Sequence, residues 1–192
     1  MAKQQALKSR EQDQRLYSLL NSSDIQLVPY VELEDGWSLD YEVLLQFGIM
    51  AQTSPIFSRT FYDGTVNDPQ QFVEKMQSRR NNPVFIFDHE KPAAVAWLND
   101  VTANYAFGHF MVLPDYWGER AMEFGHRVLD YWFTISPALE FVIGMIPGFN
   151  RLAMAYIKRL GFKDLGRVPM LMVRNGRRDD CAFFYYSRFD HD

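Results

Sequence analysis

The side chain best suited to acid–base chemistry near neutral pH in this sequence is that of His109. An imidazole exchanges its proton close to neutral pH, so a histidine beside a bound amine can accept the proton that the amine must lose. The alternating residues 104–113 predict a strand, which places His109 on one face with Met111 and Leu113. His109 is therefore a candidate general base. The alternative is a hydrogen-bonded histidine at the edge of the core.

The other histidines and the single cysteine do not indicate a metal centre. His89, His126 and His191 form no ligand spacing with a carboxylate or with Cys181. The nucleophile elbow G-x-S-x-G, the phosphate loop G-x-x-x-x-G-K-S/T and the dinucleotide pattern G-x-G-x-x-G are also absent from the sequence. The sequence predicts no metal site and argues against hydrolase and nucleotide-hydrolysing activities.

A second chemical feature lies where the strand ending at Leu113 leads into a helix beginning at Gly118. The first turn of a helix carries backbone N–H groups without helical partners and the positive end of the helix dipole. Both favour a bound phosphate or another anion. We therefore expect the segment from Gly118 to Met122 to face any anionic ligand.

Composition limits the partners that this chain can attract. Its 192 residues suit one domain, and the formal net charge of −4 gives no general attraction to nucleic acid or to an anionic membrane. No apolar run is long enough to span a bilayer, and the first residues lack the apolar core of a signal peptide. One cysteine fits a reducing compartment. We expect a cytoplasmic protein without nucleic-acid or membrane partners.

Hydrophobic periodicity predicts the elements that must position these residues. Strands are expected at residues 25–33, 84–88, 93–98, 104–113, 140–146, 168–173 and 181–186, and helices at 38–52, 68–80, 118–135 and 150–160. The strand–helix–strand passage through residues 118–135 predicts one parallel crossover. The predicted class is α+β, with a central mixed, mostly antiparallel sheet flanked by helices and formed by residues 25–192.

Residues 112–118 read Val-Leu-Pro-Asp-Tyr-Trp-Gly, and residues 150–166 combine Asn150, Gly161, Phe162 and Gly166. Together with the order of elements over residues 25–188, these stretches resemble the GNAT superfamily of N-acetyltransferases. The first is similar to the form found in the ribosomal-protein N-terminal acetyltransferases, where a strand enters the loop that binds the pyrophosphate of coenzyme A. The resemblance implies an N-acetyltransferase with acetyl-CoA as co-substrate and an amine as acceptor.

The resemblance also implies roles for particular residues. In the family, strand backbone holds the pantetheine arm, the following loop faces the diphosphate, and an asparagine orients the arm. Transferred to this sequence, these cofactor-binding roles fall on Met111, Val112 and Leu113, on Gly118, Glu119, Arg120, Ala121 and Met122, and on Asn150.

The pyrophosphate loop departs from the family pattern Gln/Arg-x-x-Gly-x-Gly/Ala at all three specified positions. Trp117 stands at the Gln/Arg position, Arg120 at the central glycine and Met122 at the final small residue. Two alternatives follow. Arg120 turns outward and grips a phosphate, or Arg120 and Met122 fill the cleft. In the second case the chain is a catalytically inactive binding or assembly protein with this fold, for example a phage-encoded virion component.

Many relatives place a tyrosine four residues before the glycine of the second stretch, as general acid toward the departing thiolate. That position is Ile157 in this sequence. Tyr156 precedes it and is turned by about 100° around the helix, so its side chain should not point in the same direction. Tyr156 is still a candidate acid, with core packing as the alternative. Ala153 and Arg159 stand near the usual serine and lysine of this signature.

The charged residues 1–24 predict an N-terminal helix or arm. With the many aromatic residues of the chain, this arm suggests a homo-oligomer or an assembly partner. The amine acceptor is not specified by the sequence: a protein N-terminus, a side-chain amine and a small molecule all stay open.

Overall fold

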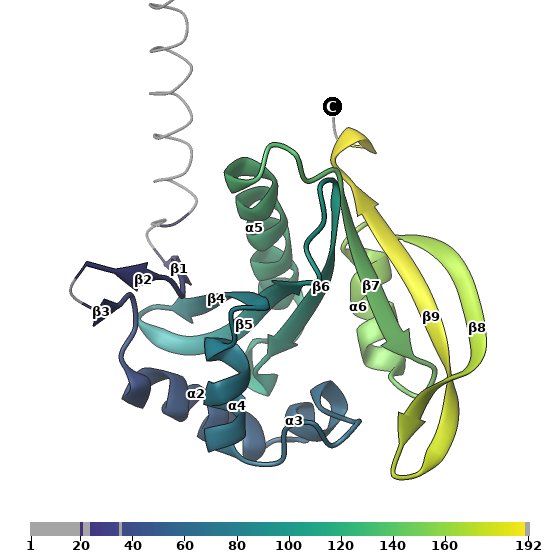
Figure 1. Cartoon of the computed structure of the whole chain (residues 1–192), viewed down its shortest axis with the longest axis horizontal. Coiled ribbons are helices and arrows are strands. Elements are labelled where there is room, and N and C mark those ends of the chain that lie inside the picture. Colours follow the sequence, from purple (N-terminus) through teal and green to yellow (C-terminus); the bar gives the residue numbers. More distant parts are fainter. Residues whose placement is uncertain (1–19, 21–23, 35, 191–192) are drawn as a thin grey trace, which may run out of the picture.

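The computed structural model describes Leu20, residues 24–34 and residues 36–190 (Figure 1). Its centre is a seven-stranded sheet in the order β1-β4-β5-β6-β7-β9-β8, in which only β6 and β7 are parallel neighbours. The strands are β1 (Ile25–Pro29), β4 (Asn81–Asp88), β5 (Lys91–Asn99), β6 (Tyr105–Val112), β7 (Phe141–Pro147), β8 (Lys163–Arg174) and β9 (Arg177–Ser187). The predicted α+β class with a mixed, mostly antiparallel sheet is confirmed.

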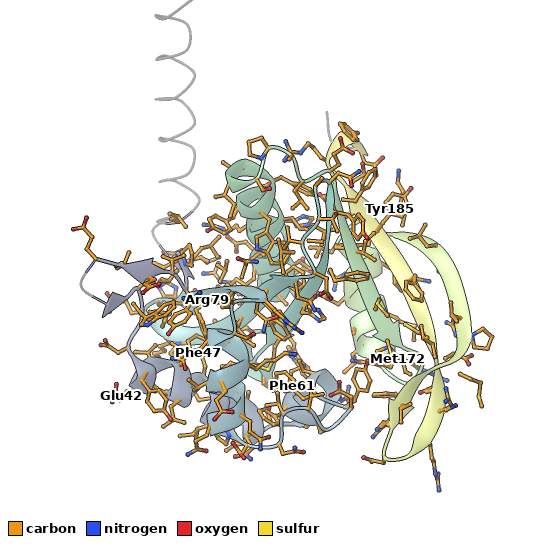
Figure 2. The ribbon with its side chains drawn as sticks, viewed as in Figure 1. Glu42, Phe47, Phe61, Arg79, Met172 and Tyr185 are labelled. Atoms are coloured by element: carbon orange, nitrogen blue, oxygen red, sulfur yellow. The ribbon has the colours of Figure 1, made fainter. Side chains whose placement is uncertain are left out.

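Helices cover both faces of this sheet (Figure 1). The helices α2 (Tyr41–Gln52), α3 (Pro55–Thr60) and α4 (Pro69–Gln77) pack on one face, and α5 (Glu119–Ile135) and α6 (Arg151–Arg159) pack on the other. Successive side chains of each strand pack on opposite faces of the sheet: Trp97 of β5 packs with α2–α4, whereas its neighbour Ala96 packs with α5. Phe47 and Phe61, labelled in Figure 2, belong to the first layer.

The two parallel strands separate along their length. β6 and β7 pair through three residues only, from Tyr105 with Phe141 to Phe107 with Ile143. Beyond Phe107 each strand keeps only its outer neighbour, β5 for β6 and β9 for β7. Figure 1 shows the two arrows diverging toward their carboxyl ends. The sheet is therefore open at its centre, and the backbone edges that line the opening are free of strand partners.

The helices on the first face begin at polar caps followed by proline. The Asp68 side chain accepts a hydrogen bond from the Gln71 N–H at 2.8 Å, and Pro69 opens α4, as predicted. Ser54 and Pro55 start α3 in the same way, and this short helix was not predicted. The helix predicted to start at residue 38 begins later: α2 starts after Asp40, and the Ser38 hydroxyl donates to the carbonyl of Pro29 at 2.6 Å.

The helices on the second face begin and end where the sequence predicts. Gly118 precedes α5 with φ +104°, a backbone conformation that favours glycine. The Asn150 side chain caps α6 by accepting from the Ala153 N–H at 3.3 Å, and Gly161 ends that helix with φ +99°. The Gly118 and Asn150 caps lie on the two sides of the opening between β6 and β7.

The chain ends of the domain differ in part from the expectation. The predicted strand 25–33 divides into β1 and the short strand β2 (Glu32–Leu33), which forms a hairpin with β3 (Gly36–Trp37). The β8–β9 hairpin turns at Asn175 and Gly176, both with positive φ, and its strands are longer than the predicted strands 168–173 and 181–186. The predicted arm, residues 1–24, lies outside the described residues apart from Leu20 and Asp24. In the described ranges no helix has the length and apolar character needed to cross a membrane.

Candidate active site

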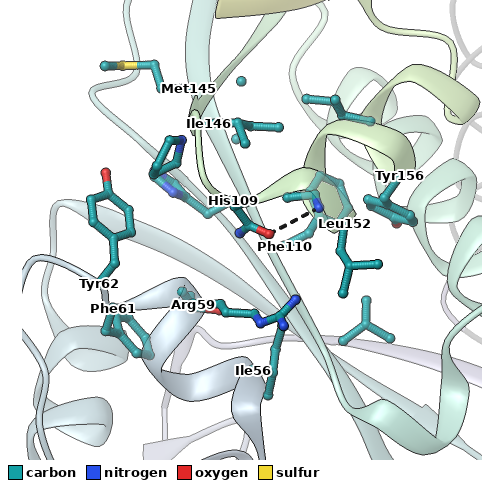
Figure 3. A pocket seen from close by; sticks show the side chains of 18 of the residues that line it. Ile56, Arg59, Phe61, Tyr62, His109, Phe110, Met145, Ile146, Leu152 and Tyr156 are labelled. Carbon is teal, nitrogen blue, oxygen red and sulfur yellow. Dashed lines mark hydrogen bonds between the residues drawn. The ribbon is translucent and has the colours of Figure 1, made fainter. Parts of the chain in front are cut away.

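A cavity of about 560 Å³ occupies the opening between β6 and β7. Figure 3 shows its walls: Tyr62 follows α3, His109 and Phe110 come from β6, Met145 and Ile146 from β7, and Leu152 and Tyr156 from α6. Trp117, Gly118 and Ala121 at the start of α5 also line it. Because the opening passes between the two helical layers, the cavity has one side formed by α5 and α6 and another formed by α3 and α4.

The β6 edge offers backbone groups to this cavity at alternate residues. The Leu113 N–H donates to the Ala93 carbonyl of β5 at 2.9 Å, and in an antiparallel pair such bonds recur at every second residue. Met111 therefore also turns its backbone groups toward β5. The prediction that Met111 and Leu113 hold a ligand through their backbone is wrong, and both side chains are buried in the core.

The same alternation turns the backbone groups of Gly108, Phe110 and Val112 toward β7, and all three residues line the cavity. The sequence analysis did not identify Gly108 and Phe110. The alternation of the predicted strand indicates both residues only if the free edge of that strand is known. Val112 alone of the three predicted strand residues faces the opening.

Trp117 occupies part of this edge. Its indole N–H donates to the Val112 carbonyl at 2.9 Å, and its ring lines the cavity while remaining 43% exposed. The indole N–H thus makes a hydrogen bond at the end of β6 that a ligand donor could otherwise make. A ligand that bonds the Val112 carbonyl must share this oxygen with the indole or displace the indole.

The first turn of α5 presents free backbone donors at the mouth of the cavity. No side chain caps Gly118, and the first hydrogen bond of the helix is that from the Met122 N–H to the Gly118 carbonyl at 3.3 Å. The amides of Glu119, Arg120 and Ala121 consequently have no partner within the helix, as at any helix start. They carry the positive end of the dipole of a 17-residue helix.

Arg120 and Met122, the two large residues of this turn, do not line the cavity. The Arg120 guanidinium binds both carboxylate oxygens of Asp88, with Nε to Oδ2 at 3.1 Å, and its Nη1 lies 2.6 Å from Oε2 of Glu123. These bonds hold the pKa of the Asp88 carboxyl below its ordinary value and raise the pKa of Arg120. Met122 is buried in the core between α5 and the sheet.

Neither alternative drawn from the sequence describes these side chains. Arg120 does not turn outward, because Asp88 at the end of β4 pulls it across the helix, and the two side chains do not fill the cleft. The carboxylate at the mouth is instead that of Glu119. It pairs with Arg159 of α6, Oε1 to Nη2 at 2.6 Å, and both side chains are exposed.

Tyr156 is held in a structural contact. Its hydroxyl donates to the Ala121 carbonyl at 2.9 Å, and the same hydroxyl lies where a Cβ at Gly125 would come within 2.4 Å. Burial raises the pKa of Tyr156. The phenol joins α5 to α6 through the gap that Gly125 leaves, and this geometry weighs against the predicted role as a general acid. Asn150 lines the cavity as expected, with its Oδ1 engaged by the Ala153 amide.

His109 lines the cavity from the side formed by α3 and α4. Its Nε2 lies 2.8 Å from Oδ1 of Asn99, and its ring stacks on Trp97 with centroids 4.9 Å apart and planes 8° apart. An amide oxygen only accepts, so Nε2 carries the proton and Nδ1 of the neutral ring is an acceptor. Burial, aided by the positive charge of Lys75, lowers the pKa of His109 to about 4. The ring is therefore neutral at physiological pH.

Several cavity residues come from the segment around α3 and were missed together with that helix. Arg59 ends α3, Tyr62 and Asp63 follow it, and Lys75 projects from α4. The Tyr62 hydroxyl lies 3.1 Å from the Met172 sulfur, and burial raises the Tyr62 pKa to about 12. Among the described residues no group of histidine, cysteine and carboxylate side chains is arranged to hold a metal ion.

No protein-family model and no curated protein matches the sequence. Solved structures do match the fold. The acetyltransferase that modifies the N-terminal serine of ribosomal protein L7/L12 from Salmonella typhimurium superposes with a TM-score of 0.68 at 13% identity, covering 86% of this chain and 96% of that one. Spermidine N-acetyltransferase from Vibrio cholerae, in complex with CoA and spermine, gives 0.66 at 19% identity, covering 88% and 98%.

A third structure is the microcin C7 self-immunity acetyltransferase MccE in complex with acetyl-CoA and AMP. It superposes with a TM-score of 0.66 at 17% identity and covers 86% of this chain and 93% of that one. These neighbours are acetyltransferases of the GNAT type. At such identities the likeness establishes architecture: the chain has the GNAT fold, resembling that of the ribosomal-protein acetyltransferase branch.

Proposed function

We propose that this protein transfers an acetyl group from acetyl-CoA to an amine. The observation that carries the proposal is the parting of β6 and β7 after three paired residues, with the uncapped first turn of α5 at the mouth of the resulting cavity. The fold neighbours solved with acetyl-CoA or CoA support the same ligand. When bound, acetyl-CoA supplies an activated acetyl group, and the chain supplies position and proton transfer.

The residues on the α5 side of the cavity fit this ligand. The backbone groups of Gly108 and Phe110 face the opening without strand partners and can bond the amides of a pantetheine arm. The free amides of Glu119, Arg120 and Ala121 would receive the diphosphate, as helix starts do in other phosphate sites. Arg159 lies at the same mouth and is positioned to contact a phosphate if its pair with Glu119 opens.

His109 is suited to receive the proton of the attacking amine. It lies on the cavity wall opposite the α5 turn, it is neutral, and the Asn99 bond leaves Nδ1 as the accepting atom. Asn99 and Trp97 fix the plane of the ring. Its low pKa suits a base that acts late, when the attacking nitrogen has already gained positive charge and become acidic.

One observation favours a second candidate, a binding or assembly protein that has lost catalysis. The Trp117 indole already occupies the Val112 carbonyl. The edge strand β8 also exposes apolar side chains, among them Leu165, Met170 and Val173. In this alternative the chain binds a partner along β8 and has no affinity for acetyl-CoA. The enzyme would be expected in the cytoplasm, and the assembly protein would be expected in a virion.

Two measurements separate the candidates. Isothermal titration of the full chain with acetyl-CoA is expected to give saturable heat, and release of free CoA thiol is expected when a panel of amines is added. A matched control is Arg151→Gln, which removes a charge from the exposed start of α6 without touching the cavity lining. No heat and no thermal shift at about millimolar acetyl-CoA, a concentration at which even weak binding registers, would reject the enzyme.

A further inference from the structure

The acceptor side of the cavity carries positive charge without a protein counter-ion. Arg59 from α3 and Lys75 from α4 line it, and among the described residues neither forms an ion pair. By contrast, Arg159 on the cofactor side is paired with Glu119. Both side chains are half-buried, so their charges are available to a ligand that enters the cavity.

The single carboxylate among the described cavity-lining side chains offsets only part of this charge. That carboxylate is Asp63, and its Oδ1 accepts from the N–H of Thr65 at 3.1 Å and from the Thr65 hydroxyl at 2.8 Å. Asp63 therefore shapes the turn after α3. Its negative charge remains, but Arg59 and Lys75 together outweigh it and leave this side of the cavity with an excess of positive charge.

Arg59 and Lys75 share this side with the histidine that we assign as base. The His109 ring lies against Trp97, which in turn stacks on Phe61 at the end of α3, with centroids 6.1 Å apart. Lys75 is close enough to act electrostatically on His109. Figure 3 shows Arg59 extending from α3 into the same cavity, with its guanidinium on the side of Ile56 and Leu152. An acceptor whose amine lies at His109 therefore has Lys75 near the ring and Arg59 farther along the cavity wall.

We propose that the acceptor is an amine that also bears an anionic group, a carboxylate or a phosphate, held by Arg59 and Lys75. The inference rests on the proposed acetyl transfer and names its acceptor class. A guanidinium binds either oxyanion bidentately and an ammonium binds it as a point charge, so the pair grips the anion while the amine faces Nδ1 of His109. The apolar flank formed by Tyr62 and Met172 would contact the body of the molecule.

The same charges disfavour polycationic acceptors. A polyamine bound beside His109 would bring further ammonium groups against Arg59 and Lys75, with Asp63 as the one carboxylate among the described lining residues to receive them. This wall therefore selects between two kinds of amine by charge, and an acceptor with one amine and one anionic group fits it best.

The test is a comparison of matched amines in the CoA-release assay. L-Phenylalanine is compared with L-phenylalaninamide, phosphoethanolamine with ethanolamine, and spermine is run beside them. We expect kcat/KM for the better anionic member to exceed that for its neutral partner about tenfold or more, as a charge-assisted contact implies. The first pair reports a carboxylate and the second a phosphate. A preference for neutral amines or for spermine overturns the proposal.

Variants then attribute the preference to the two cations. Arg59→Gln and Lys75→Gln should each lower the ratio of kcat/KM for the anionic amine to that for its neutral partner about tenfold, chiefly through KM of the anionic amine. Lys91→Gln, at the exposed start of β5 and outside the cavity lining, is the charge-matched control. Variants that weaken acetyl-CoA binding but leave acceptor KM unchanged would assign the cations to the cofactor and overturn the proposal.

A binding arm keeps this inference separate from the proposed activity. N-Acetyl-L-phenylalanine, N-acetyl-L-phenylalaninamide and N-acetylphosphoethanolamine are titrated into the protein without acetyl-CoA. Binding of an anionic probe that is lost in the Arg59→Gln, Lys75→Gln double variant supports the anion site, even if acetyl-CoA gives no heat and the enzyme proposal fails. Equal binding of the two phenylalanine probes, or no binding of either anionic probe, overturns it.

Discussion

Protonation of His109 should destabilise the fold as the pH falls. In the folded chain, burial lowers its pKa from the ordinary 6.5 to about 4, and the Nε2–H is committed to Asn99. In the unfolded chain the ring takes up its proton near its ordinary pKa. Because the unfolded state binds this proton at the higher pH, the stabilisation is complete above the unfolded pKa and is lost as the pH falls from 6.5 toward 4.

The size of this effect follows from the two pKa values. Each unit of difference in pKa between the folded and unfolded states corresponds to about 1.4 kcal/mol of stability. For values of 6.5 and about 4, the full loss is about 3 kcal/mol, of which about 2 kcal/mol is lost by about pH 5. That is a substantial fraction of the roughly 5–15 kcal/mol that stabilises a typical domain.

This loss of stability is measured by urea unfolding of the wild type and of His109→Gln at about pH 8 and about pH 5. Glutamine keeps an amide donor for Asn99 but does not titrate, so carboxylates common to both proteins cancel in the difference. We expect wild type to lose about 2 kcal/mol more than the variant between these two pH values. His126→Gln, an exposed histidine on α5, should follow wild type. Parallel pH dependence of wild type and His109→Gln would refute the assigned pKa.

Three further substitutions test the cofactor side. Trp117→Phe frees the Val112 carbonyl. Because one net hydrogen bond is worth about 1 kcal/mol, calorimetry should show acetyl-CoA binding that is about fivefold tighter. Weaker binding would show that the indole assists the ligand. Tyr156→Phe should lower the free energy of unfolding by about 1 kcal/mol and leave kcat nearly unchanged, because the hydroxyl donates its hydrogen bond to the Ala121 carbonyl. A hundredfold loss of kcat would support the general-acid role instead. Arg120→Met should leave acetyl-CoA affinity within about twofold but lower the free energy of unfolding by about 2–3 kcal/mol, because the Asp88 carboxylate loses its partner. Loss of affinity at unchanged stability would show that Arg120 binds the phosphate instead.

Local signals in the sequence were sufficient to predict much of the fold. Asp68 with Pro69, and Asn150 with Gly161, mark helix ends through bonds made within a few residues, so the pattern alone indicates them. Ser54 and Pro55 carry the same start signal for α3. That helix was missed because its six residues are too few to show a helical period. The Arg59 and Tyr62 side of the cavity was missed with it.

Contacts between distant segments were beyond the sequence. Arg120 meets Asp88 across 32 positions, and nothing near either residue indicates that they pair. Strand alternation restricts the ligand-facing backbone to every second residue of β6, but which edge β5 covers depends on the order of strands in the sheet. Met111 and Leu113 were therefore assigned to the wrong edge, whereas Val112, one residue away from each, faces the opening.

Amide chemical shifts during an acetyl-CoA titration of ¹⁵N-labelled protein test the central claim most directly. The parted strands and the free α5 turn predict saturable shifts at Gly108 and Phe110 and at residues 119–121, with the β8 edge unaffected. Shifts confined to β8, or no saturable change at the α5 turn with acetyl-CoA at about millimolar concentration, would contradict it.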